Sequence, residues 1–121
     1  MHQIAAAASY GAAALLEADE RRERELRVLL ANYFSGDRVR QIPARMQKRR
    51  LLAEWLSFRF DRGRKYPEQA VNAIITFHHA DFATLRREMI DHGFMRRRDG
   101  LYWRECPEPD DGPLGARLVE R

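Results

Sequence analysis

Two clusters of arginine lie close together in the segment over residues 81–104. Residues 81–104 read DFATLRREMIDHGFMRRRDGLYWR, with an Arg pair at 86–87 and an Arg run at 96–98. A guanidinium group carries a planar fork of N–H donors that matches phosphate and the guanine edge. These residue types therefore indicate recognition of a polyanion, and nucleic acid is the leading candidate.

Two local elements would present these arginines. Asp81 is a good N-cap for a helix over residues 82–92, and Gly93 is expected to end that helix. The dipeptide Asp99-Gly100 then predicts a β-hairpin over residues 94–105. A two-residue loop pairs Arg98 with Leu101, Arg97 with Tyr102 and Arg96 with Trp103. Neither face of this hairpin is cleanly apolar, as expected for a ribbon that projects from a small core.

Three helices are predicted before this segment. Residues 17–34 begin with acidic side chains and continue with apolar residues on one face, and Ser35-Gly36-Asp37 is expected to end the helix. Residues 48–60 have a second apolar face. Residues 67–79 form another helix, with Pro67 at its first position after a turn at 61–65. Val39 and Ile42 mark a short extended piece between the first two.

This order predicts a mainly α fold with a small β-hairpin. Three helices followed by a β-ribbon are the order of a winged helix-turn-helix, here a three-helix core plus wing preceded by an N-terminal helix. A generic α+β domain is the alternative. The expected division is an N-terminal helical extension over 1–35, a winged-helix domain over 36–105 and a flexible acidic tail over 106–121.

The charge distribution agrees with this division. Residues 36–104 hold 16 Lys/Arg and 8 Asp/Glu, a net charge of +8. Residues 1–35 hold 4 and 5, a net charge of −1, and residues 105–121 hold 2 and 5, a net charge of −3. The central module is therefore basic enough to attract polyanions.

Several classes of function are disfavoured. Cys106 is the single cysteine, so we expect neither an intramolecular disulfide nor a multi-cysteine metal site. His78, His79, Asp81 and His92 do not make a convincing metal site, because Asp81 is better explained as a cap and His78 as a core residue. No catalytic triad, carboxylate pair or phosphate-binding glycine loop is evident, so we predict no enzyme, cofactor or small-molecule substrate. The uncharged residues 1–16 resemble neither a signal peptide nor a membrane span, and we expect a cytoplasmic protein with no membrane contact.

The predicted nucleic-acid contacts fall into three groups. The helix over residues 82–92, the third helix of the winged-helix domain, would contribute Thr84, Arg86 and Arg87 to base edges or phosphates. The wing would hold phosphates through Arg96, Arg97, Arg98 and Arg104. The cluster Lys48, Arg49 and Arg50 would contact the flanking backbone.

Each group has a purely structural alternative. Arg87 can pair with Asp91 at i+4, and Arg86 can pair with Asp81 or with neighbouring helices. The wing arginines can be a solvated surface. The Lys48–Arg50 cluster can lie within a helix that begins earlier, near Ala44. Tyr102 and Trp103 offer stacking surfaces for single-stranded RNA, although aromatic residues at such positions often pack a hairpin onto its domain.

The helix over residues 17–34 carries a one-sided apolar stripe. Such a stripe packs either on its own domain or on a partner. If it pairs two copies of the chain, its dimer face is Leu26, Leu29, Leu30 and Tyr33.

Several segments together resemble the bacterial DUF2087 family. They are GDRVRQIP, KRRLLAEWLSFRF, YPEQAVN, the block DFATLRREMIDHGFM with its following Arg, and YWR. Members of the family occur alone or behind ArsR-type winged-helix domains, which implies a role near transcriptional regulation. Here only the helix over residues 17–34 precedes the module, so we expect no effector-sensing half. Pro67 departs from the family, which tends to have a capping Thr at this position.

These observations predict a DNA-binding transcriptional regulator or accessory factor. The third helix would enter the major groove of double-stranded DNA, and the wing would hold phosphates. A protein-interaction module built on the same scaffold is the first alternative, and a single-stranded RNA binder is the second. Salt dependence separates groove binding from an apolar interface.

Overall fold

The chain is mostly helical, with two small antiparallel sheets. The computed structural model describes the backbone of residues 2–105 and the side chains of residues 13–105. The helices are α1 (His2–Leu29), α2 (Met46–Ser57), α3 (Glu68–His78) and α4 (Phe82–Asp91). The strands are β1 (Phe34–Ser35), β2 (Arg38–Val39), β3 (Lys65–Pro67), β4 (Met95–Arg98) and β5 (Leu101–Arg104), and a 3-10 turn, η1 (Ala31–Tyr33), joins α1 to β1.

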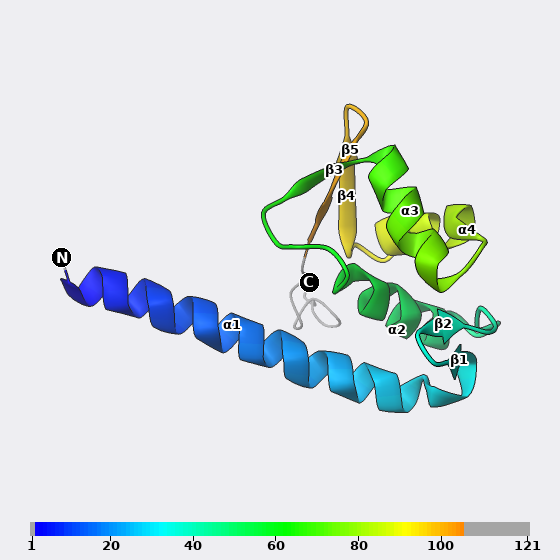
Figure 1. The fold of residues 1–121 in the computed structure, drawn as a ribbon, viewed down its shortest axis with the longest axis horizontal. Coiled ribbons are helices and arrows are strands. Elements are labelled where there is room, and N and C mark those ends of the chain that lie inside the picture. The colour runs from blue at the N-terminus through cyan, green and yellow to red at the C-terminus, as the bar shows by residue number, and fades with distance from the viewer. Residues whose placement is uncertain (1, 106–121) are drawn as a thin grey trace, which may run out of the picture.

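Figure 1 shows a compact body with one long arm. Helix α1 runs along the lower side of the view, and its N-terminal part extends beyond the body. The β4–β5 hairpin projects on the side of the body away from α1, beside α3. In the larger sheet the strand order is β3-β5-β4, and both pairs of neighbours are antiparallel.

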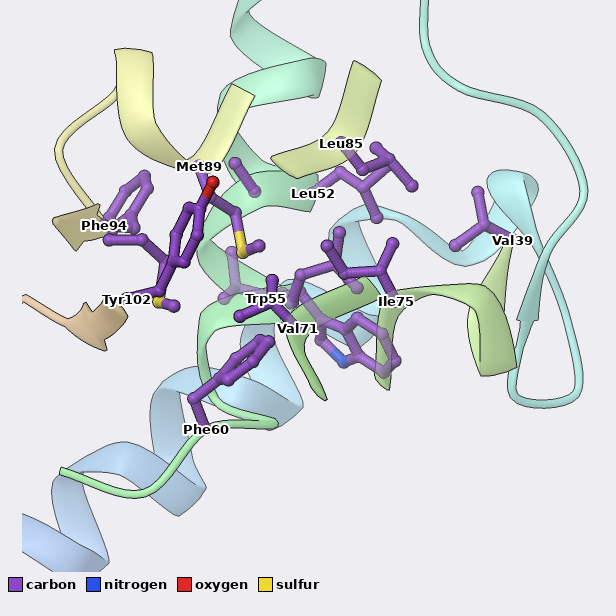
Figure 2. Packing of buried hydrophobic residues seen from close by; sticks show 14 of the residues in the cluster. Val39, Leu52, Trp55, Phe60, Val71, Ile75, Leu85, Met89, Phe94 and Tyr102 are labelled. Carbon is purple, nitrogen blue, oxygen red and sulfur yellow. The ribbon is translucent and has the colours of Figure 1, made fainter. Parts of the chain in front are cut away.

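The core lies where α2, α3 and α4 meet the inner face of this sheet (Figure 2). Leu52 and Trp55 of α2, Val71 and Ile75 of α3, Leu85 and Met89 of α4, and Tyr102 of β5 all have exposures of 2% or less. Helix α1 contributes Leu26 and Leu30 to the same cluster. The body and the C-terminal part of α1 therefore share one hydrophobic core.

The predicted end of the first helix is wrong. Helix α1 ends at Leu29, and Phe34 lies in strand β1, with its ring against that of Trp55 at 4.7 Å. Ser35-Gly36-Asp37 does not cap the helix, because Phe34 pairs with Val39 and Ser35 with Arg38 in a short hairpin. Gly36 has a φ of +62°, a conformation required both by helix C-caps and by tight hairpins. The glycine signal alone does not distinguish the two.

Strand β3 was not predicted. It covers three residues, ends in Pro67, and forms the edge of its sheet. Tyr66 is held there by the ring of Phe60 at 5.1 Å and by its cross-strand neighbour Tyr102. Because Pro67 belongs to the strand and is the N-cap of α3, the helix begins at Glu68 rather than at the proline.

Other predicted bounds also differ. Helix α1 begins at His2, before residue 17, and α2 spans Met46–Ser57, so Phe60 lies beyond its end. Ile42 lies outside the strands.

Other short-range predictions are confirmed. Helix α4 begins after Asp81, and Gly93 beyond its end has a φ of +84°. The predicted pairs of the C-terminal hairpin are all present. Val39 is in an extended segment, as expected. The predicted tail over residues 106–121 lies outside the described residues.

The described residues contain neither a membrane-spanning helix nor a cluster of metal-binding side chains. None of their helices is long and apolar enough to cross a membrane. No group of three or more His, Cys, Asp or Glu side chains in residues 13–105 is arranged to hold a metal ion.

Candidate nucleic-acid interface

Helix α4 is anchored on one side and exposed on the other. The Asp81 side chain accepts a hydrogen bond from the Thr84 backbone N–H at 3.2 Å, and hydrogen bonds from Thr84 hold the pKa of Asp81 below its usual value. Leu85 and Met89 are buried, with exposures of 1% and 0%. Arg87 lies on the exposed side of the helix. Arg87 has no ion pair within the described part of the chain, so the predicted pair with Asp91 is not present there.

Arg86 turns away from this exposed side toward α3. Its guanidinium group donates a hydrogen bond to Asn72 Oδ1 at 2.5 Å and lies 3.9 Å from Glu68 Oε2. The expected pairing with a neighbouring helix is therefore present. Arg86 fixes the spacing of α3 and α4, whereas Thr84 is partly buried beside its cap.

The hairpin is attached to the body through its inner face. Met95 and Tyr102 lie on that face with exposures of 2% and 1%. The Tyr102 hydroxyl donates to Glu68 Oε1 at 2.7 Å. Burial and this bond to Glu68 raise the pKa of Tyr102, and the same bond lowers the pKa of Glu68. Tyr102 is thus a structural anchor and offers no stacking surface.

The turn of the hairpin has the geometry that its sequence predicts. Asp99 and Gly100 have φ values of +54° and +78°, so both central residues are in the left-handed region. This is the two-residue turn whose twist matches that of the flanking strands. The turn directs the Arg run of β4 beyond the hydrophobic core.

The three arginines of β4 are exposed but have different neighbours. Arg97 lies over the Tyr102 ring at 5.7 Å, and its charge lowers the pKa of Glu68. Arg98 is 83% exposed and 4.0 Å from Asp99 at the tip. Arg96 is on the outer face, paired across the strands with Trp103. The hairpin therefore carries cations on both faces.

Arg104 was predicted to clamp phosphate together with these three, and the structure places it elsewhere. Its side chain is only 5% exposed and donates to Asp19 of α1 at 3.1 Å. Its guanidinium group also lies over the Phe58 ring at 4.6 Å. Arg104 pairs with Met95 on the inner face, at the end of the hairpin nearest the body, so it binds α1 rather than solvent.

The Lys48–Arg50 cluster is divided among different partners. The Lys48 ammonium donates to the Leu29 carbonyl at the C-terminus of α1, at 3.2 Å. Arg49 donates to the Ala44 carbonyl and lies 3.5 Å from Glu88 of α4. Arg50 is exposed and lies over the Phe94 ring at 5.1 Å. Of the three, Arg50 alone has no hydrogen bond or ion pair to another described residue.

The predicted dimer face is largely internal. Leu26 and Leu30 are fully buried in the core of their own chain, and Tyr33 packs against that core. Leu29 is 48% exposed, next to Val28 at 75%. Dimerisation stays a prediction, but Leu26 and Leu30 do not form an exposed surface for it.

The comparisons with known proteins identify a family for this chain. Residues 38–104 match the model of DUF2087, described as an uncharacterized protein conserved in bacteria. The chain belongs to the DUF2087 family. No match was found among curated proteins or among solved structures. The matched part begins at β2 and ends with the last residue of β5, so it contains the hairpin and α4 but not α1.

Two residues important for this surface were not singled out from the sequence. Asp19 holds both Arg62 and Arg104, although it is 85 positions from Arg104 along the chain. Lys65 lies over the Trp103 ring at 5.1 Å because β3 pairs with β5. No local pattern predicts either contact, since each depends on the tertiary arrangement.

Proposed function

We propose that this DUF2087 member binds double-stranded DNA as a winged helix-turn-helix protein and acts in bacterial transcription. Helix α4 would enter the major groove, and the β4–β5 hairpin would contact phosphates beside it. The element order α2-β3-α3-α4-β4-β5 and the sheet order β3-β5-β4 are compatible with that fold. Groove binding by a helix with an adjacent β-ribbon is a common docking arrangement.

The observation that carries this proposal is the exposure of arginines on α4 and the hairpin that are not held by carboxylates of the described chain. Segment 95–101 contains three Arg and one Asp, a net charge of +2. Arg87, Arg96 and Arg97 have no ion pair among residues 13–105, and the contact of Arg98 with Asp99 is highly exposed. Such guanidinium groups can bind phosphate without breaking a bond on which the fold depends.

The proposed contact set is smaller than the sequence indicates. It consists of Arg50, Arg87, Arg96, Arg97 and Arg98. Lys48, Arg49, Arg86 and Arg104 are left out because each is held by another part of the chain. Thr84 is left out because it completes the cap of α4.

A salt titration of duplex binding tests the proposal. Fluorescence anisotropy with a labelled random-sequence duplex would be measured from about 50 to 200 mM salt. We expect affinity to fall steeply as the salt concentration rises. The slope of log affinity against log salt concentration should become shallower by about 0.9 for each phosphate contact removed. The variant Arg96→Ala/Arg97→Ala/Arg98→Ala should therefore bind more weakly, with a slope shallower by about 2–3.

A matched control removes the same charge from another exposed surface. Arg21, Arg24 and Arg45 are exposed and have no ion pair to any described residue. Arg21→Ala/Arg24→Ala/Arg45→Ala should keep most of the affinity and the slope. Equal losses in the two triple variants would mean that net charge alone drives binding, and no binding by wild type at low salt would reject the proposal.

A specific surface supports protein docking as a second candidate. Phe77 of α3 is 65% exposed, and Ala73 one turn before it is also exposed, whereas Ala70 and Ile74 of the same stripe pack against the core. An apolar partner on this stripe would bind with little salt dependence. Phe77→Ser would weaken that interaction and leave duplex binding unchanged.

A further inference from the structure

The outer face of the three-stranded sheet carries an aromatic ring between cations. Trp103 of β5 pairs with Lys65 of β3 on one side and with Arg96 of β4 on the other. Residues directly opposite one another in an antiparallel sheet project to the same face. These three side chains therefore form one cross-strand row.

The next row on the same face continues this pattern. Leu101 pairs with Pro67 and with Arg98. Leu101 is 37% exposed, and Pro67 and Arg98 are also exposed. The outer face thus offers an apolar centre from Trp103 to Leu101, bordered by Lys65, Arg96 and Arg98.

The orientation of the Trp103 ring is restrained. Its Nε1–H donates to Glu105 Oε1 at 3.1 Å, and the Lys65 ammonium lies 5.1 Å from the ring centre. The ring is partly exposed, whereas Tyr66 and Tyr102 of the inner face are buried. Helices α3 and α4 contact the sheet, whose inner face carries the buried Tyr66, Met95 and Tyr102. By strand register, Trp103 lies on the opposite face.

We propose that this outer face binds a single strand of nucleic acid, with an unpaired base stacked on Trp103. Lys65, Arg96 and Arg98 would hold the phosphates on either side of that base. Stacking on an aromatic side chain inside a cationic groove is how proteins bind single strands without reading their sequence. Duplex DNA does not fit this role, because its bases are already stacked on one another. The inference does not depend on duplex binding by α4.

The test uses the intrinsic fluorescence of the full chain. Trp55 is 2% exposed in the core, so quenching by added nucleic acid reports on Trp103. The probes are oligothymidylate and oligouridylate of about 12 nucleotides, each compared with a duplex of the same length. We expect both single strands to quench the emission at low salt; quenching by one of them alone would identify DNA or RNA as the preferred strand.

Two sets of variants, one at Trp103 and one at the cations, separate the contribution of stacking from that of charge. Because the Trp103 variants lack the reporting ring, their affinity is measured by fluorescence anisotropy of a labelled single strand. Trp103→Leu should lose about tenfold in affinity, and Trp103→Phe should lose far less because it keeps an aromatic face. Lys65→Gln/Arg96→Gln should make the salt slope shallower by about 1.4, at about 0.7 per contact for single strands. Arg21→Gln/Arg24→Gln is the matched charge control and should leave the slope unchanged.

The outcomes separate this inference from the proposed function. If neither oligothymidylate nor oligouridylate quenches the emission at low salt, the single-strand proposal is overturned. It is also overturned if Trp103→Leu binds the single strand as tightly as wild type. If Trp103→Leu unfolds, the Trp103→Phe and Lys65→Gln/Arg96→Gln variants decide the question. Duplex affinity should be unaffected by Trp103→Leu and reduced by Arg87→Ala, so either hypothesis can fail without the other.

Discussion

Two groups of arginines in this molecule have opposite surroundings. Where α1 meets the body, Arg22 donates two bonds to Glu54 at 2.8 and 2.9 Å, and Arg59 is bound to Glu23. Arg62 and Arg104 share Asp19. On the hairpin, Arg96, Arg97 and Arg98 are exposed and lack a comparable carboxylate partner among the described side chains. We call the first group the α1 seam and the second the hairpin arginines.

The difference shows that the ion pairs of an arginine say more about its role than the net charge of its segment does. In the seam, burial and the charge of nearby Arg104 lower the pKa of Arg59, and Glu23 and Asp19 of α1 form ion pairs with Arg59 and Arg104. These arginines join α1 to the body, and a buried cation without its partner is strongly destabilising. The hairpin arginines have no such role, which leaves them available to a ligand. Four predictions test this division.

The largest expected effect is on stability, from Asp19→Ala. This change leaves the buried guanidinium group of Arg104 without its carboxylate, and we expect a loss of about 3 kcal/mol in the free energy of unfolding. Urea denaturation followed by circular dichroism measures it. Glu17→Ala is the matched control, since Glu17 is exposed on the same helix, and it should change stability by less than about 0.5 kcal/mol.

Arg104 and Arg96 offer a direct comparison between the two groups. Arg104→Ala should destabilise the fold by about 2 kcal/mol, because a buried charge pair and its packing on Phe58 are lost. Arg96→Ala should change stability by less than about 0.5 kcal/mol. Thermal unfolding of both variants is the measurement. A similar shift in the two would contradict the division into structural and available arginines.

A smaller effect is expected at the start of α4. Asp81→Ala removes the side chain that caps the Thr84 N–H, and this should cost about 1 kcal/mol of stability. Asp81→Asn keeps an accepting oxygen and should lose less. Because α4 also carries Arg87, the Ala variant should weaken duplex binding without changing the salt slope. A changed slope would mean that Asp81 acts on the ligand itself.

The smallest effect concerns acid pH. Burial tends to raise the pKa of Asp19, but hydrogen bonds and charges from Arg62 and Arg104 outweigh it, and the pKa lies below the usual 3.8. The stability from this carboxylate is therefore complete above 3.8 and is lost as the pH falls through the lower folded value. Unfolding measured from neutral to acid pH should show a steeper loss in wild type than in Asp19→Asn. Equal profiles for wild type and Asp19→Asn would mean that a group other than Asp19 causes the acid sensitivity.

Local signals predicted much of the fold correctly. The cap at Asp81, the glycine after α4 and the Asp-Gly turn each act within a few residues, so their geometry follows from neighbouring residue types. The same holds for the hairpin register. Local signals were insufficient at Gly36, where two structures need the same backbone conformation, and at β3, whose Tyr66 is held by the distant Tyr102.

The candidate site was predictable only in part. Arg86 and Arg87 are adjacent and chemically identical, yet one binds Asn72 while the other faces solvent. Arg98 and Arg104 differ in the same way across a single hairpin. Which guanidinium group meets a carboxylate depends on helix packing, and no spacing rule within the segment contains that information.

The sequence by itself determined the short elements, the family and the concentration of positive charge, because propensity, capping and turn chemistry act over a few residues. The tertiary structure decided which cations are paired, which face of the hairpin is covered, and that Trp103 rather than Tyr102 is accessible. The physical reason is that burial and ion pairing arise between residues far apart in the chain, such as Asp19 and Arg104.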